Sequence, residues 1–137
     1  MRILQIHCYK FSYEVKKETP VAEQPPNPRE DDFEDVLVCF ICYEKHDENR
    51  EDGIVEEVLK HLKIDIERIK CKRVLLYPYA HLSKNLGSPK KAKTFLNSLR
   101  DRLLEAGIET HKSPFGWYKA FTLRCIGHPL AEAYREF

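Results

Sequence analysis

Lys119 is the residue of this chain whose position most suggests chemistry. The stretch from Trp117 to Cys125 alternates between two rows of side chains, and Lys119 falls in the same row as Phe121. In a strand, such a row points to one face of the sheet, so the pattern places an ammonium among apolar side chains. Burying an ammonium is costly unless it has a partner, and Glu132 follows within reach of a short turn. The pattern therefore indicates either a charged pair with Glu132 in a functional site or a lysine at a strand end whose head stays in water.

Other side chains give weaker signals. His81 follows an apolar strand, at the kind of strand end where α/β proteins bind ligands, although a loop histidine also serves structure alone. Cys39 and Cys42 have the spacing of a metal or redox pair, but positions three apart on a strand point to opposite faces, so we expect core residues. The sequence contains no HExxH, GxSxG or phosphate-loop motif. It therefore predicts no metal site, no cofactor and no serine nucleophile.

The composition is typical of a soluble single domain. The chain has 137 residues, of which 42% are hydrophobic and 33% are charged, and no apolar segment is long enough to span a membrane. The five scattered cysteines form no disulfide framework and no signal peptide begins the chain, so we expect a cytoplasmic protein. A net charge of +1 is small for a protein that binds nucleic acid by neutralising phosphates alone. Any nucleic-acid role would therefore depend on a local site or on another part of a longer chain.

Strands and helices alternate along the chain and would position these residues. Apolar segments and alternating patterns predict strands at 2–15, 35–45, 73–79, 108–112 and 117–126. Helices are predicted over 51–69, from Ser88-Pro89 to Gly107, and over 128–137, where Pro129 stands near the first turn. The proline-rich, acidic stretch 18–32 is typical of an exposed loop.

This order of elements predicts an α/β fold of two layers, a mixed β-sheet with helices on one face, formed by residues 1–137 as one domain. The other face of the sheet is also apolar around Val36–Tyr43. That face needs cover, which either a second copy of the chain or a curled sheet would provide.

Three motifs stand in a definite order: Tyr77-Pro-Tyr-Ala-His81-Leu-Ser, Pro114-Phe-Gly-Trp-Tyr-Lys119-Ala-Phe and Gly127-His-Pro-Leu-Ala-Glu132. Together with the opening Arg2-Ile-Leu-Gln-Ile-His7, they resemble the N-terminal editing domain of archaeal threonyl-tRNA synthetases over nearly the whole chain. The resemblance implies a fold like that of D-aminoacyl-tRNA deacylases and a homodimer. It also implies hydrolysis of L-seryl-tRNA(Thr), with threonyl-tRNA(Thr) spared.

The same resemblance assigns roles to individual residues. Lys119 and Glu132 would be the charged site residues, with His81 and Tyr118 beside them. The 3′ end of tRNA(Thr) and its serine would lie against a second group, which consists of Pro78, Tyr79, Ala80, Phe40, Cys42, Tyr43, Phe115, Gly116 and Trp117.

The sequence departs from the family pattern at two of these positions and at its end. Trp117 stands where the pattern has tyrosine and Tyr43 where it has a smaller aliphatic residue, which affects the width of the pocket. A synthetase would continue into further domains after Glu132, so we expect an excised or separately encoded domain. Two alternatives stay open, a D-aminoacyl-tRNA deacylase and a non-catalytic dimeric module that binds a nucleotide or an amino acid.

Overall fold

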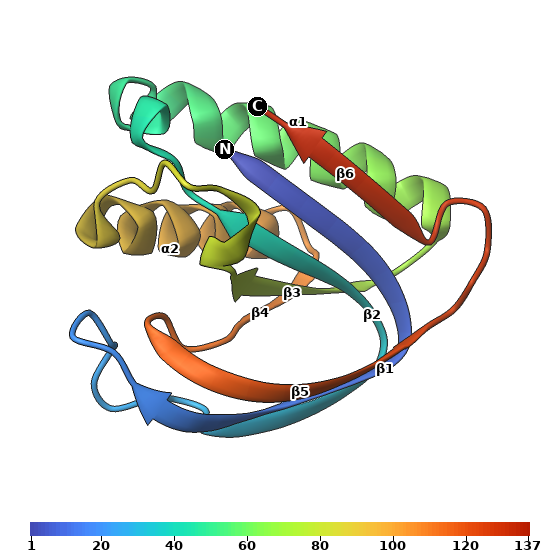
Figure 1. Cartoon of the computed structure of the whole chain (residues 1–137). Helices are drawn as coiled ribbons and strands as arrows, with labels where there is room; N and C mark the ends of the chain where they lie inside the picture. The colour runs from blue at the N-terminus through green and yellow to red at the C-terminus, as the bar shows by residue number, and fades with distance from the viewer.

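The architecture is a six-stranded mixed sheet with two helices on one of its faces (Figure 1). The structure, a computed structural model, describes residues 1–137 except for the side chains of residues 51 and 52. The strands run in the order β4-β3-β2-β1-β5, and β6 also pairs with β1. β1 (Arg2–Glu18) is antiparallel to β2 (Glu30–Cys42), β5 (Trp117–Cys125) and β6 (Glu132–Glu136), whereas β3 (Arg73–Pro78) and β4 (Glu109–Lys112) extend the sheet in parallel. The predicted α/β fold with a mixed sheet is confirmed.

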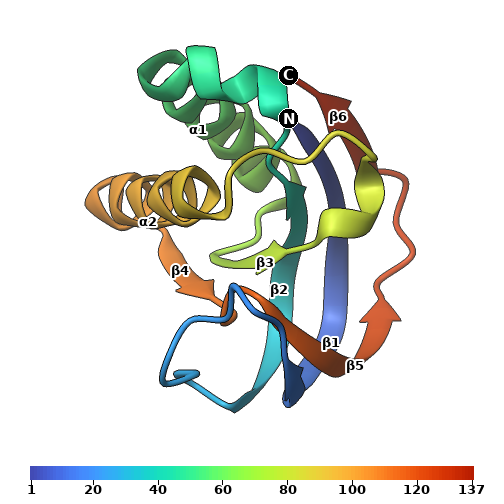
Figure 2. The same cartoon turned by 60° about the vertical axis from the view of Figure 1, so that its left-hand side comes forward.

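Both helices pack on the same face of the sheet, as their apolar stripes predicted (Figure 2). α1 (Glu51–Ile69) has the predicted bounds, and α2 spans Pro89–Glu105. Pro89 occupies the first turn of α2, and Gly107 follows the helix with a φ of 79°, which a glycine adopts without strain. The hydroxyl of Ser88, however, makes no capping hydrogen bond. The five predicted stripe residues of α2 are all buried: Ala92, Phe95, Leu96, Leu99 and Leu103.

The opposite face of the sheet is covered in part by the sheet itself. β1 bends along its length, so that β5 and the adjoining parts of β1 and β2 curl over the concave side (Figure 1). A second apolar cluster fills this side, and we call it the concave cluster. It consists of Cys8, Phe11, Tyr13, Phe33, Val36, Val38, Phe40, Leu75 and Tyr77.

The C-terminal segment forms the strand β6, and the helix predicted over 128–137 is wrong. β5 pairs with β1 only as far as Cys8, so the first residues of β1 have a free edge on that side. β6 fills this edge, from the pair Ile6–Glu132 to the pair Arg2–Glu136. A free edge of backbone donors and acceptors is a strong template for a strand, and it overrides local propensity.

The β1–β2 hairpin is longer than the sequence predicted. Its ladder continues to the pair Glu14–Glu30, so both ends of the stretch expected to be a loop over 18–32 belong to strands. Cross-strand pairing accommodates the acidic residues at the start of β2 because Glu30, Asp32, Glu34 and Asp35 are exposed and Asp31 is only partly buried. Two short 3₁₀ helices complete the fold, η1 (Lys45–Asn49) and η2 (Ala80–Leu82).

Candidate functional site

Lys119 lies on the concave side of the sheet with its ammonium largely enclosed. The Nζ atom donates hydrogen bonds to the carbonyl oxygens of Pro114, at 2.7 Å, and Trp117, at 3.2 Å. It also lies 4.8 Å from the centre of the Tyr77 ring, which makes a cation–π contact. Burial lowers the pKa of Lys119 to about 8, while the carboxylate of Glu23 acts to raise it. The predicted inward position of Lys119 is therefore confirmed.

Aromatic rings connect Lys119 with His81. The ring of Tyr77 lies 6.4 Å from that of Tyr79, which in turn lies 5.1 Å from the ring of His81. Phe40, on the neighbouring strand, contacts Tyr77 at 5.2 Å and Tyr79 at 5.1 Å. Of the predicted site residues, Lys119, Phe40, Tyr79 and His81 are thus linked by one chain of aromatic contacts through the buried ring of Tyr77.

Several polar contacts fix η2, which follows Pro78 at the carboxyl end of β3. Arg2 Nη1 donates to the carbonyl oxygen of Leu82 at 3.0 Å, and the Ser83 hydroxyl donates to Glu44 Oε1 at 2.5 Å. The Cys42 thiol lies 3.7 Å from the carbonyl oxygen of Ala80. The backbone N–H of Tyr79 donates to the carbonyl oxygen of Ile41 at 2.8 Å, which ties the start of η2 to β2.

An open pocket lies beside η2. Its volume is about 660 Å³, and Arg2, Glu44, His81 and Ser83 are among the residues that line it. The exposed His81 therefore contacts the Tyr79 ring and also lines the open pocket. This position suits a residue at the rim of a site.

The structure separates Glu132 from Lys119. Along β1, Lys119 stands opposite Val15 and Glu132 stands opposite Ile6, nine residues away. Figure 1 shows the start of β5 and the start of β6 at opposite sides of the molecule. Glu132 is exposed, and its carboxylate accepts a weak hydrogen bond from the Cys125 thiol at 3.8 Å. The expected ion pair is not formed within the chain, because the full length of β5 lies between the two residues.

Three further predicted site residues point away from Lys119. Tyr118 lies in the other row of β5 and is 59% exposed. Tyr43 packs on Phe95 of α2, with ring centres 5.7 Å apart, on the helical face of the sheet. Phe115 also packs against the core of the helical face. Gly116 and Trp117 contribute instead to the turn before β5, whose carbonyl oxygens bind the ammonium.

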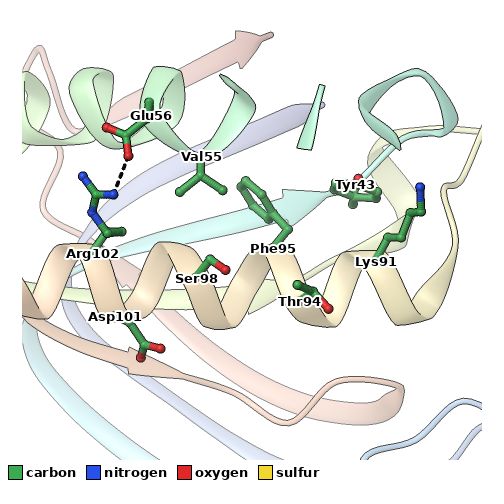
Figure 3. Close-up of a pocket in the computed structure, with 9 residues that line it drawn as sticks. All are labelled: Tyr43, Val55, Glu56, Lys91, Thr94, Phe95, Ser98, Asp101 and Arg102. Atoms are coloured by element: carbon green, nitrogen blue, oxygen red, sulfur yellow. Dashed lines mark ion pairs between the residues drawn. The ribbon is translucent and has the colours of Figure 1, made fainter. Parts of the chain in front are cut away.

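A groove of about 560 Å³ runs between α1 and α2 (Figure 3). An ion pair of 2.7 Å between Glu56 and Arg102 bridges the two helices at one end. Tyr43 and Phe95 form its apolar wall. The groove lies on the helical side, and Tyr43 is the single predicted site residue that lines it. The concave side is therefore the better candidate for an active site.

His128 of the third motif belongs to a separate chain of hydrogen bonds. Its Nδ1 accepts from the N–H of Leu130 at 3.1 Å, so neutral His128 carries its proton on Nε2 and donates to His7 Nδ1 at 2.8 Å. His7 in turn donates from Nε2 to Asp35 at 2.8 Å.

His7 and Asp35, with Cys71, lie close enough to one another to hold a metal ion, within 4.8 Å. The same Nε2 that would bind a metal carries a proton in this hydrogen-bond chain. The arrangement therefore favours a structural role, in which the third motif is tied to β1 and β2.

Sequence reasoning missed three residues of the site: Tyr77, Phe121 and Glu23. The rings of Tyr77 and Phe121 lie 5.8 Å apart on the concave side. Both carried a signal, since Tyr77 opens the first motif and Phe121 shares the row of Lys119. Glu23 carried none, because it lies in a stretch whose composition is that of an exposed loop.

Comparison with known proteins identifies the family. The model of the archaea-specific editing domain of threonyl-tRNA synthetase matches residues 1–137. The chain belongs to this family. The editing domain is 43% identical over 136 residues to the threonine–tRNA ligase of Methanobrevibacter smithii and 41% identical over 135 residues to that of Methanopyrus kandleri. Each alignment covers 98% of this chain and 22% of the relative, so the chain spans about a fifth of the length of these relatives.

A solved structure shares the fold of the editing domain. The c-Myc DNA Unwinding Element Binding Protein superposes with a TM-score of 0.65 over 100% of this chain and 99% of that chain, at 11% sequence identity. At this identity the similarity concerns the fold alone. In the part of the chain that the structure describes, no helix combines the length and apolarity needed to cross a membrane.

Proposed function

We propose that this editing domain hydrolyses the ester bond of L-seryl-tRNA(Thr) to serine and free tRNA, and that it spares threonyl-tRNA(Thr). The observation that carries the proposal is the enclosed ammonium of Lys119, which a chain of aromatic contacts links to Phe40, Tyr79 and His81. Membership of the family supports an aminoacyl-tRNA as the substrate. We also propose that its fold is related to that of D-aminoacyl-tRNA deacylases and that it acts in the cytoplasm.

The need for such a reaction follows from the similarity of serine and threonine. Serine is smaller by one methyl group, so a synthetic site built for threonine cannot exclude it by size. A missing contact of this size is worth only about 1–3 kcal/mol, which is too little for accurate translation. A second site that admits serine and excludes threonine restores the accuracy.

The chemistry requires a water molecule that attacks the ester carbonyl, stabilisation of the oxyanion that forms, and departure of the ribose oxygen. The ammonium of Lys119 supplies a positive charge inside the protein, where electrostatic stabilisation is stronger than in water. The backbone of Pro78–Ala80 supplies polar groups that hold the terminal adenosine and the amino acid.

A cysteine nucleophile is not part of the proposal. The Cys42 thiol contacts the carbonyl oxygen of Ala80 in η2, and burial raises the pKa of this thiol, which disfavours the reactive thiolate. The proposed reaction therefore uses a positioned water and the tRNA's own 2′-hydroxyl, and it needs no cofactor. Glu132 keeps a proposed role in this reaction, but not through contact with Lys119 of the same chain.

The decisive experiment compares three substrates with the purified domain: L-seryl-tRNA(Thr), L-threonyl-tRNA(Thr) and D-seryl-tRNA(Thr). We expect rapid release of L-serine and slow release of threonine. Equal rates on the two L-esters would contradict the proposal. Faster release from the D-ester would instead assign the domain to D-aminoacyl-tRNA deacylation, and binding of a seryl-adenosine analogue without turnover would indicate a binding module.

A further inference from the structure

The loop of residues 19–29 packs tightly against the turn of residues 113–117, which precedes β5. The backbone N–H and the hydroxyl of Thr19 both donate to the carbonyl oxygen of Gly116, at 3.0 and 2.6 Å. The backbone N–H of Glu23 donates to the carbonyl oxygen of Phe115 at 3.0 Å, and Trp117 Nε1 donates to the carbonyl oxygen of Glu23 at 2.8 Å. This loop is thus a structural support for the turn.

The carboxylate of Glu23 makes two further contacts with the same region. Its Oε2 accepts from the backbone N–H of Phe115 at 2.7 Å, and its Oε1 forms an ion pair of 2.7 Å with Lys112 Nζ. Lys112 is the last residue of β4. Glu23 therefore ties the end of β4 to the turn that follows it.

That turn provides the two carbonyl oxygens that bind the Lys119 ammonium, from Pro114 and Trp117. We propose that Glu23 is a positioning residue for Lys119. Its carboxylate fixes the turn that holds the ammonium, and its negative charge offsets part of the cost of burying that ammonium. Its importance for catalysis rests on the proposed function, whereas its effect on Lys119 does not.

Among the described residues, Glu23 is the acidic group whose negative charge acts on Lys119. The Tyr77 ring faces the ammonium from β3, and burial raises the pKa of that phenol, so it stays neutral. Val15 of β1 stands opposite Lys119 and carries no charge. Glu23 acts on Lys119 electrostatically without a direct hydrogen bond, and Lys112 pairs with the same carboxylate. Changes at Glu23 and at Lys112 should therefore affect Lys119 in opposite directions.

The test measures the pKa of Lys119 by NMR titration of its side chain in the intact domain. Glu23→Gln keeps the size of the side chain and an oxygen that accepts from the N–H of Phe115, but it removes the negative charge. The pKa of Lys119 should therefore fall by about half a pH unit or more. Lys112→Met is the matched control, because it removes the ion pair and leaves the carboxylate. That variant should raise the pKa of Lys119.

An unchanged or raised pKa of Lys119 in Glu23→Gln would overturn the inference. If Glu23 only supported the loop, the substitution would loosen the loop, expose the lysine and so raise its pKa. The kinetic readout is the pH dependence of deacylation, whose fall at high pH should move to lower pH in Glu23→Gln. If the NMR shift is seen but neither variant nor parent releases serine, the positioning role stands and the proposed function fails.

Discussion

At the scale of single residues, the charge of Lys119 sets the predicted pH dependence. The pKa of Lys119 is about 8, so its side chain is charged below pH 8 and loses its proton as the pH rises through that value. If the charged form stabilises the oxyanion, enzyme-catalysed deacylation should fall as the pH rises from 7 to 9. Lys119→Arg keeps its charge over this range, so whatever activity it retains should not fall. Rates of serine release, corrected for spontaneous hydrolysis at each pH, check this, and parallel profiles of the two proteins would contradict it.

Lys119→Met separates the charge from the packing of the stem. The variant should fold, because methionine fills the space beside Tyr77, but kcat/KM for L-seryl-tRNA(Thr) should fall by about 30- to 1,000-fold. This range corresponds to about 2–4 kcal/mol of transition-state stabilisation. Circular dichroism confirms the fold of the variant, and unchanged deacylation would return Lys119 to a purely structural role.

At the scale of elements, the turn before β5 depends on Gly116. Its φ of 75° is unfavourable for other residues, and a Cβ there would lie 2.7 Å from the Cα of Ala22 and from the carbonyl oxygen of Val21. Gly116→Ala should therefore cost about 3 kcal/mol of folding free energy and slow deacylation, since the turn holds Lys119.

Gly107 gives the matched control for this prediction. Its φ is 79°, but a Cβ at this position would meet nothing within 4 Å, so Gly107→Ala should cost only the conformational strain of about 1 kcal/mol. Urea denaturation of both variants measures the difference. Equal destabilisation by the two substitutions would show that the close packing of the 19–29 loop on the turn does not contribute to the free energy of unfolding.

At the scale of the whole molecule, exposed apolar side chains predict a homodimer. Tyr9, Tyr118 and Tyr134 are 61%, 59% and 51% exposed, and all three lie on β1, β5 or β6. The curled sheet covers the concave cluster but leaves these side chains in water, where apolar surface favours association. Sedimentation velocity at increasing protein concentration should show a dimer, and a monomer at every concentration would refute this.

The sequence by itself determined α1, α2 and the row of Lys119. The stripe of α2 and the alternation of β5 are periodic over short windows, and burial of one face follows from such periodicity whatever the partner is. The order of the three motifs also led to the family, because the motifs lie in contiguous stretches that need no structure to be recognised.

Only the tertiary structure decided the C-terminal strand, the distance between Lys119 and Glu132, and the role of Glu23. β6 forms because β1 has a free edge beside it, and that edge is created by pairing with segments far away in the chain. Glu23 reaches the turn before β5 across about ninety residues of sequence. Such contacts depend on which strands become neighbours, and strand pairing between distant segments leaves no periodic signal in either segment alone.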